Sequence, residues 1–167
     1  MKTITQQELK SLFRYEPETG IFTRLVTRGN VVAGTIVVCK DRKGYLRIGI
    51  NRFSFLAHRL AFVYMIGKEP TNEVDHINGK RDDNRWTNLR DASAAQNACN
   101  RKTRRDNKNG LKGVKWNASN KQWHARIQHR GRRVHLGIFK TKELAHEFYC
   151  LAADLLHGDF SNYGSVK

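Results

Sequence analysis

Residues 73–100 read EVDHINGKRDDNRWTNLRDASAAQNACN, and this stretch decides both the fold and the chemistry that the chain can support. Asp75 and His76 are adjacent, and Asn88 and Asn97 follow. An Asp carboxylate and an Asn amide oxygen are hard oxygen ligands suited to Mg²⁺ or Mn²⁺, and a neutral His can take a proton from water near physiological pH. These residue types at this spacing suit hydrolysis of a phosphodiester with one metal ion.

The local pattern predicts a strand over residues 73–77, a sharp turn at Asn78-Gly79 and a polar loop over 80–89. Ser93 and Gln96 have the spacing of a capping box, so a helix is expected to start near residue 94 with Asn97 in its first turn. Exposed backbone N–H groups in a first turn favour a nearby phosphate.

A site built from both Asp75 and His76 requires the chain to bend. Neighbouring residues of a strand point to opposite faces, so the strand must end or bend between them, and the Asn78-Gly79 turn makes this feasible. Asn88 is expected to hydrogen-bond the backbone around His76 and hold the loop against the strand.

The net charge of +16 indicates a partner that is a polyanion, with nucleic acid favoured over a membrane. No stretch approaches the ~18 apolar residues of a spanning helix, and the N-terminus has no apolar segment typical of secretion. Three widely separated cysteines, Cys39, Cys99 and Cys150, argue against a disulfide framework and against a structural zinc site. We therefore expect a cytoplasmic protein, in the host cell if a phage encodes it.

The pattern divides the chain into residues 1–104, a basic linker at 105–112, and residues 113–167. A capping box at Thr5 predicts an N-terminal helix. Beyond it we expect strands at residues 21–26, 35–40 and 45–50 and a helix over 57–65 that ends at Gly67.

The C-terminal part is expected to form a three-stranded antiparallel sheet packed on one helix. The strands are predicted at residues 114–116, 123–128 and 134–139, and the helix begins at Thr141. Strand alternation places Trp123, Ala125, Ile127, Val134, Leu136 and Ile138 against the helix.

The opposite face of that sheet is basic, as is the linker before it. Residues 101–133 hold twelve Lys and Arg against one acidic residue, Asp106. Such a sheet can lie in the major groove of DNA. For the basic run at residues 101–105, the alternative is a solvated linker that makes no contact with phosphate. The predicted DNA-binding residues are Arg101, Lys102, Arg104, Arg105, Lys115, His124, Arg126, Gln128, Arg133 and His135.

Residues 57–101 resemble the H-N-H nucleases of ββα-metal fold, in particular phage and intron homing endonucleases. The matching residues are His58-Arg59-Leu60, Val74 through Arg90, and Gln96-Asn97. The resemblance implies that His76 is the general base, Asp75 and Asn97 are ligands of one Mg²⁺ or Mn²⁺, and Asn88 is the orienting residue. His58, on a half-buried helix, is expected to be a hydrogen-bonded structural residue.

Residues 111–163 resemble the plant ethylene-response-factor (APETALA-two) type of DNA-binding domain. The match includes Gly113-Val114-Lys115, residues 134–139 and the closing Phe160-Ser161-Asn162-Tyr163. Groove binding by the sheet is what this resemblance implies. The base preference does not carry over, because the side chains on the sheet differ.

The fold class expected is therefore α+β, with an H-N-H nuclease domain bearing added β-hairpins and a sheet-plus-helix DNA-binding domain. The expected function is site-specific cleavage of double-stranded DNA, of homing type. No obligate protein partner is evident, and a double-strand break would require a dimer on DNA or two successive nicks. Two rivals remain: a non-catalytic DNA-binding regulator with the same fold, and a basic RNA-binding protein.

Overall fold

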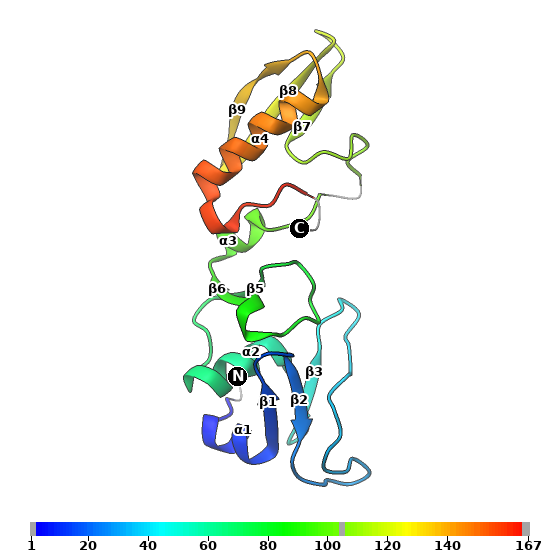
Figure 1. Cartoon of the computed structure of the whole chain (residues 1–167), viewed down its shortest axis with the longest axis vertical. Coiled ribbons are helices and arrows are strands. Elements are labelled where there is room, and N and C mark those ends of the chain that lie inside the picture. Colours follow the sequence, from blue (N-terminus) through cyan, green and yellow to red (C-terminus); the bar gives the residue numbers. More distant parts are fainter. Residues whose placement is uncertain (1–2, 104–105, 165–167) are drawn as a thin grey trace. The chain divides into compact units, whose positions relative to one another are not determined.

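The computed structural model describes residues 3–103 and 106–164, which form two compact units, residues 1–91 and residues 92–167. The architecture is mixed α+β, with small antiparallel sheets and four α-helices among the described residues (Figure 1). The expected fold class is confirmed. The two units divide the chain by packing, and the functional boundary at residues 104/105 stays a prediction.

The first unit opens with α1 (Gln6–Leu12), whose N-cap Thr5 accepts a hydrogen bond from the backbone of Glu8 at 3.1 Å. Strand β1 (Phe13–Glu16) follows at once and pairs antiparallel with β2 (Ile21–Arg24). Side chains alternate along β1: Phe13 and Tyr15 are buried, and the one residue between them is exposed. One face of the hairpin therefore packs against the core. A strand was expected at residues 21–26 but not at the residues of β1.

A second hairpin precedes the longest helix of this unit. Strands β3 (Arg47–Ile50) and β4 (Phe53–Leu56) pair through a two-residue turn at Asn51-Arg52, and α2 (Ala57–Ile66) follows directly. Gly67, at φ +84°, ends α2 in the left-handed conformation that glycine adopts readily. One core joins these elements, and its most deeply buried side chains are Leu9, Phe13, Phe22, Ile48, Leu60 and Val63.

The prediction of a strand at residues 35–40 is wrong. Only isolated bridges form there, between Thr23 and Ile36 and between Lys40 and Leu46. Val37 packs against the core, but its apolar neighbours Ile36 and Val38 are 49% and 73% exposed. Without burial of one face, a β-prone composition does not by itself form a strand.

Arg59 ties α2 to the chain that leads into the next strand. Its guanidinium donates to the backbone oxygens of Asn72 at 3.1 Å and Pro70 at 3.0 Å and pairs with Glu69 at 3.1 Å. Strand β5 (Glu73–His76) starts directly after this anchor and pairs with β6 (Leu89–Ala92). Between them lies a loop with a single 3-10 turn, η1 (Trp86–Asn88).

The second unit begins with α3 (Ala94–Cys99), where both hydrogen bonds of the predicted capping box between Ser93 and Gln96 form. Its sheet consists of β7 (Val114–Asn117), β8 (Gln122–His129) and β9 (Arg132–Phe139). Helix α4 (Lys142–His157) packs on this sheet, and η2 (Gly158–Phe160) follows it (Figure 1). The predicted sheet on one helix is confirmed.

One residue of this sheet lies on the other face from the one expected. The register shifts at a bulge between Ala125 and Arg126, so that Ile138 pairs with His124. Ile138 is therefore 47% exposed instead of packing on α4, while Leu136 remains in the core. A single extra residue reverses the alternation beyond it, which a regular two-residue period does not foresee.

Within residues 3–103 and 106–164, no helix combines the length and the apolar character needed to cross a bilayer.

Candidate active site

Strand β5 brings Asp75 and His76 to its end. Both side chains are buried, at 4% and 5% exposure. The strand stops at His76, whose carbonyl accepts the Gly79 N–H at 2.8 Å in the turn that follows. Ending the strand here allows two adjacent side chains to be buried together, as the sequence required.

Asn84 contacts the His76 ring at Nε2. Its Nε2 lies 3.0 Å from Oδ1 of Asn84, and because an amide oxygen only accepts, Nε2 carries the hydrogen. Nδ1 is then the basic nitrogen of the ring. Burial lowers the pKa of His76 below its ordinary value, and this outweighs the upward effects of the Asn84 hydrogen bond and the nearby Asp75 carboxylate. The imidazole is thus neutral at physiological pH.

Asn84 itself is fixed by the N-terminal hairpin. It is only 1% exposed, and its backbone carbonyl accepts the hydroxyl of Tyr15 at 2.7 Å. The hairpin turn also approaches it closely: a Cβ on Gly20, at φ +73°, would lie 2.3 Å from the Asn84 carbonyl carbon. Glycine is therefore required at position 20 both for its conformation and for space.

A second imidazole packs against His76. His58 of α2 meets it edge to face, with ring centroids 5.1 Å apart and an angle of 87°, and Tyr45 lies 5.1 Å from His58. Burial lowers the pKa of His58 to about 3, with further lowering by His76 and Arg59. Its Nδ1 has no hydrogen-bond partner among the described residues, so the expected hydrogen bond does not form at this nitrogen. The structural role of His58 stays a prediction.

Asn88 braces the loop that follows His76. Its Oδ1 accepts the backbone N–H of Asn78 at 3.0 Å, and its Nδ2 donates to the Asp83 carbonyl at 2.7 Å. The Asn88 carbonyl accepts the N–H of Ile77 at 2.9 Å. The carboxylate of Asp83 pairs with Arg85 at 2.7 Å, which lowers the pKa of Asp83 to about 2. These contacts close the loop in the manner that the sequence led us to expect.

Asp75 forms a buried ion pair. Its Oδ2 accepts from Nε of Arg90 at 2.8 Å and from Nη2 at 2.6 Å. The two charged side chains are 5% and 17% exposed. Arg90 thus neutralises the carboxylate that was expected to hold a metal ion, and any cation bound there shares that carboxylate with the guanidinium or displaces it.

The donor types still suit a hard cation. No group of three His, Cys, Asp or Glu side chains that could hold a metal occurs in the parts of the chain that the structure describes. Mg²⁺, however, binds through one or two carboxylates and keeps several waters, so Asp75 with an amide oxygen matches its chemistry. Asn97, the other expected ligand, lies on α3 in the second unit, and its role as a ligand stays a prediction.

The predicted DNA-binding residues fall into four groups. Arg104 and Arg105 lie outside the described residues. His124 is buried at 8% exposure, and its Nε2 lies 3.0 Å from Nδ2 of Asn120 and 3.3 Å from that of Asn117. Arg126 is half-buried, and the remaining side chains are exposed: Arg101, Lys102, Lys115, Gln128, Arg133 and His135.

Three contacts at this site were not predicted. The sequence does not distinguish Asn84 from the other polar residues of the loop, because its contact with His76 depends on how the loop closes. His58 was noted, but nothing in its spacing shows that its ring meets His76. Arg90 had one usable signal, since opposite charges at Asp75 and Arg90 flank the polar loop at distances that suit two paired strands.

Comparison with known proteins locates the family resemblance within this geometry. Residues 55–99 match the HNH endonuclease family model. We call residues 55–99 the HNH segment; it contains α2, β5, β6 and α3 and every residue of the predicted catalytic and metal set. This part of the chain is thus similar to a family of endonuclease domains, and the similarity suggests a nucleic-acid-cleaving function.

A phage protein is also similar to the chain. "Protein 3.8" of Escherichia phage T7 is 29% identical over 90 residues, which cover 54% of this chain and 74% of that protein. Its name indicates no activity. No solved structure matches the chain significantly.

The close approach of Gly20 to Asn84 predicts a position-specific cost of substitution. Gly20→Ala is expected to destabilise the protein by more than the about 1–2 kcal/mol that a left-handed alanine costs, because its Cβ would overlap the Asn84 backbone. Gly29→Ala is the matched control, since Gly29 has φ +58° and nothing within 4 Å of its Cβ position. Equal losses in chemical denaturation would contradict this account.

The buried neutral imidazole of His58 predicts acid sensitivity. Its pKa is about 3 in the folded chain against 6.5 ordinarily, so the unfolded chain binds more protons between these values. The stability that His58 contributes is complete above pH 6.5 and is lost as the pH falls toward 3. His58→Gln should lose less in melting temperature over this interval than the natural protein. Parallel losses would show that His58 does not titrate as described.

Proposed function

We propose that the chain is a site-specific DNA endonuclease of homing type that works with one divalent metal ion. The observation that carries this proposal is the neutral, buried His76, held through Nε2 by Asn84 and adjacent to Asp75, inside the HNH segment. A general base must be uncharged at the working pH and must be held in one orientation, and His76 meets both requirements.

His76 is the general base in this mechanism. Its Nδ1 takes a proton from water, the water oxygen bonds to phosphorus, and the bond from phosphorus to the 3′ oxygen breaks. The departing 3′ oxygen takes a proton from a second water molecule, and His76 returns its proton to the solvent, which leaves 5′-phosphate and 3′-hydroxyl ends. Asp75 and Asn97 would hold Mg²⁺ or Mn²⁺, which when bound supplies positive charge for the departing oxygen. Asn84 fixes the tautomer of His76, and Asn88 keeps the surrounding loop closed.

The second unit supplies the contact with double-stranded DNA in this proposal. The exposed residues Lys115, Gln128, Arg133 and His135 of its sheet provide donors to phosphates and base edges. We place His124 beneath this surface, where its contacts with Asn117 and Asn120 support the β7–β8 turn. Groove binding by the sheet is proposed from the sequence motifs that resemble ethylene-response-factor domains, a resemblance that the comparison with known proteins does not support. One catalytic site per chain suits nicking.

The Asp75–Arg90 ion pair favours one rival, a DNA-binding regulator that keeps the nuclease fold without its chemistry. Arg90 satisfies the carboxylate with no metal ion. Supercoiled plasmid incubated with Mg²⁺ or Mn²⁺ separates the two functions. The endonuclease converts it to nicked or linear DNA and stops when a chelator is added, whereas the regulator binds the plasmid and leaves it supercoiled at every pH and metal concentration.

His76→Ala is expected to lower the cleavage rate by about 100- to 10,000-fold, the range that a general base contributes, and to leave DNA affinity nearly unchanged. His129→Ala, a change of the same kind at the end of β8, is the control and should cleave normally. Cleavage of plasmid under single-turnover conditions measures both. A normal rate in His76→Ala would remove His76 from the mechanism.

Asn84→Ala is expected to slow cleavage by about 10- to 100-fold, the usual effect of losing a group that orients a catalytic imidazole. Asn84→Asp keeps an oxygen that accepts from Nε2, so it should retain more activity than Asn84→Ala. DNA affinity and the melting temperature, measured for each variant, show whether folding is kept. Equal activity in the two variants would mean that the oxygen at this position does not orient His76.

Arg133→Ala should weaken binding to duplex DNA without changing the rate of the bound enzyme. Because one phosphate contact would be lost, the slope of log affinity against log salt concentration should fall by about 1. Fluorescence anisotropy over a salt series measures this slope. An unchanged slope would exclude Arg133 from phosphate contact.

A further inference from the structure

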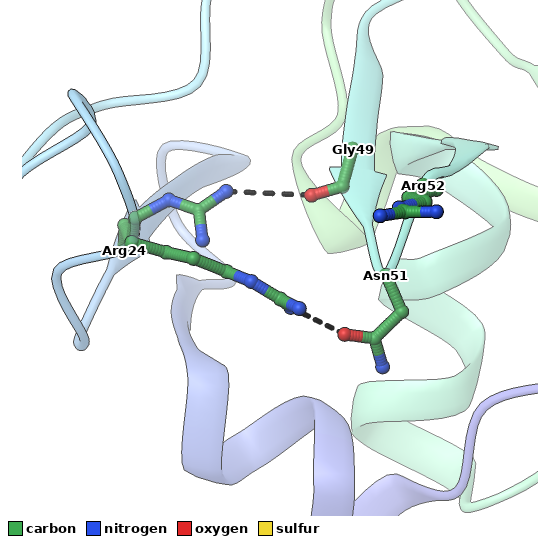
Figure 2. A pocket seen from close by; sticks show the side chains of 5 residues that line it. Arg24, Gly49, Asn51 and Arg52 are labelled. Atoms are coloured by element: carbon green, nitrogen blue, oxygen red, sulfur yellow. Dashed lines mark hydrogen bonds between the residues drawn. The ribbon is translucent and has the colours of Figure 1, made fainter.

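A hollow lined by three arginines lies in the first unit, formed by residues with no part in the chemistry above. Arg24, Arg28, Gly49, Asn51 and Arg52 surround a space of about 380 Å³. Figure 2 shows Arg24 on one side and the Gly49–Arg52 segment on the other, with their polar atoms turned toward each other across the hollow. Three positive charges therefore converge on one open space.

Among the described residues, these arginines have no carboxylate partner, a property that they share with Arg42 and Arg81 and that sets them apart from five other arginines of the same unit. Arg14, Arg47, Arg59, Arg85 and Arg90 each form an ion pair with Asp or Glu. Within residues 3–103 and 106–164, no carboxylate lies within ion-pair distance of Arg24, Arg28 or Arg52. The Glu8 carboxylate accepts from Asn51 at 3.2 Å, so one negative charge lies beside the lining without forming an ion pair with these arginines. Neighbouring positive charges repel one another, and an external anion relieves that repulsion.

Arg24 and Arg28 are nevertheless held in place. The Arg24 guanidinium lies over the Phe13 ring, 4.7 Å from its centre, and donates to the Gly49 carbonyl at 3.3 Å. Arg28 donates to Oδ1 of Asn51 (Figure 2). A Cβ on Gly49 would meet nothing within 4 Å, so the floor of the hollow is open to an approaching group. Preorganised donors of this kind lose less side-chain entropy when an anion binds.

The turn that carries Arg52 is unusual in its sequence. Asn51 and Arg52 have φ values of +49° and +67°, as in a type I′ hairpin turn. Such turns prefer Asn followed by Gly, because a left-handed residue with a side chain costs about 1–2 kcal/mol. An arginine at this position works against folding, so a role in binding would account for it.

We propose that Arg24, Arg28 and Arg52 form a phosphate-binding site for the backbone of duplex DNA, separate from the catalytic residues. Guanidinium groups match phosphate oxygens in geometry and stay charged at every physiological pH. The choice of DNA as the source of phosphate rests on the proposed endonuclease function. The anion site itself rests on the arginines and would remain if that function were wrong.

A matched pair of double variants tests the site. Arg28→Gln/Arg52→Gly removes two charges from the hollow, and Arg14→Gln/Lys68→Gln removes two charges elsewhere in the unit. Arg14 is paired with Glu16, and Arg14 and Arg24 occupy successive cross-strand pairs of the β1–β2 hairpin, so their side chains lie on opposite faces. Both are made in the full chain carrying His76→Ala, so that the DNA is not cleaved.

Affinity for a mixed-sequence duplex is then measured by fluorescence anisotropy between about 50 and 200 mM salt, where phosphate contacts dominate. The hollow variant should bind about tenfold more weakly or worse, with a salt slope smaller by about 2, one for each lost contact. The control should keep the natural slope. Equal slopes in the two double variants would overturn the proposal, as would competition by structured RNA that exceeds competition by duplex DNA.

Arg52→Gly alone separates binding from folding. Because glycine suits φ +67°, this variant should melt at the natural temperature or above it, yet bind DNA more weakly. A variant that melts lower, or that binds DNA as well as the natural chain, would contradict the assignment of Arg52. A chain that never cuts plasmid but shows these binding results would reject the endonuclease function and keep the phosphate site.

Discussion

The hydrogen bond between Nε2 of His76 and Oδ1 of Asn84 is the interaction on which the site depends. It lies where both residues are almost wholly buried, at 5% and 1% exposure, so it is shielded from competing water. Burial keeps the imidazole neutral, and the amide oxygen decides which nitrogen carries the hydrogen. The fold supplies this arrangement through Tyr15 and Gly20, which hold the Asn84 backbone against the N-terminal hairpin.

Much of this could be predicted where the signal was local. The Ser93–Gln96 capping box, the turn after His76 and the sheet on one helix follow from residue types at fixed offsets, and each forms as expected. Asn88 was expected to close the loop, and its contacts with Asn78 and Asp83 do so.

The predictions that failed depend on tertiary context. Residues 35–40 have the composition of a strand, but Val37 packs against the core while Ile36 and Val38 stay exposed, so no strand forms. Ile138 changes face because a bulge shifts the register by one residue. Asn84 and Arg90 acquire their importance only when the loop and the two strands bring them to His76 and Asp75. Opposite charges flanking the loop give one signal for the contact of Arg90, but no spacing rule predicts the contact of Asn84.

Charge is distributed over the chain in a way that separates chemistry from binding. At the candidate site, Asp75 is neutralised by Arg90 and Asp83 by Arg85, so these two charges near the His76 imidazole are compensated. In the proposals above, DNA phosphates compensate the charges of the arginines of the hollow and of the exposed residues of the C-terminal sheet. Phosphate contacts of this kind position a duplex without reading its sequence, while base edges in a groove supply selectivity.

The ring nitrogens of His76 give the most direct test of the central claim. A long-range ¹H–¹⁵N correlation spectrum of the ¹⁵N-labelled full chain at neutral pH reports which nitrogen carries the hydrogen and whether the ring is charged. We predict a neutral ring with hydrogen on Nε2 and a bare Nδ1, and a change in this pattern in Asn84→Ala. A ring with hydrogen on Nδ1, or with hydrogen on both nitrogens, would contradict the account.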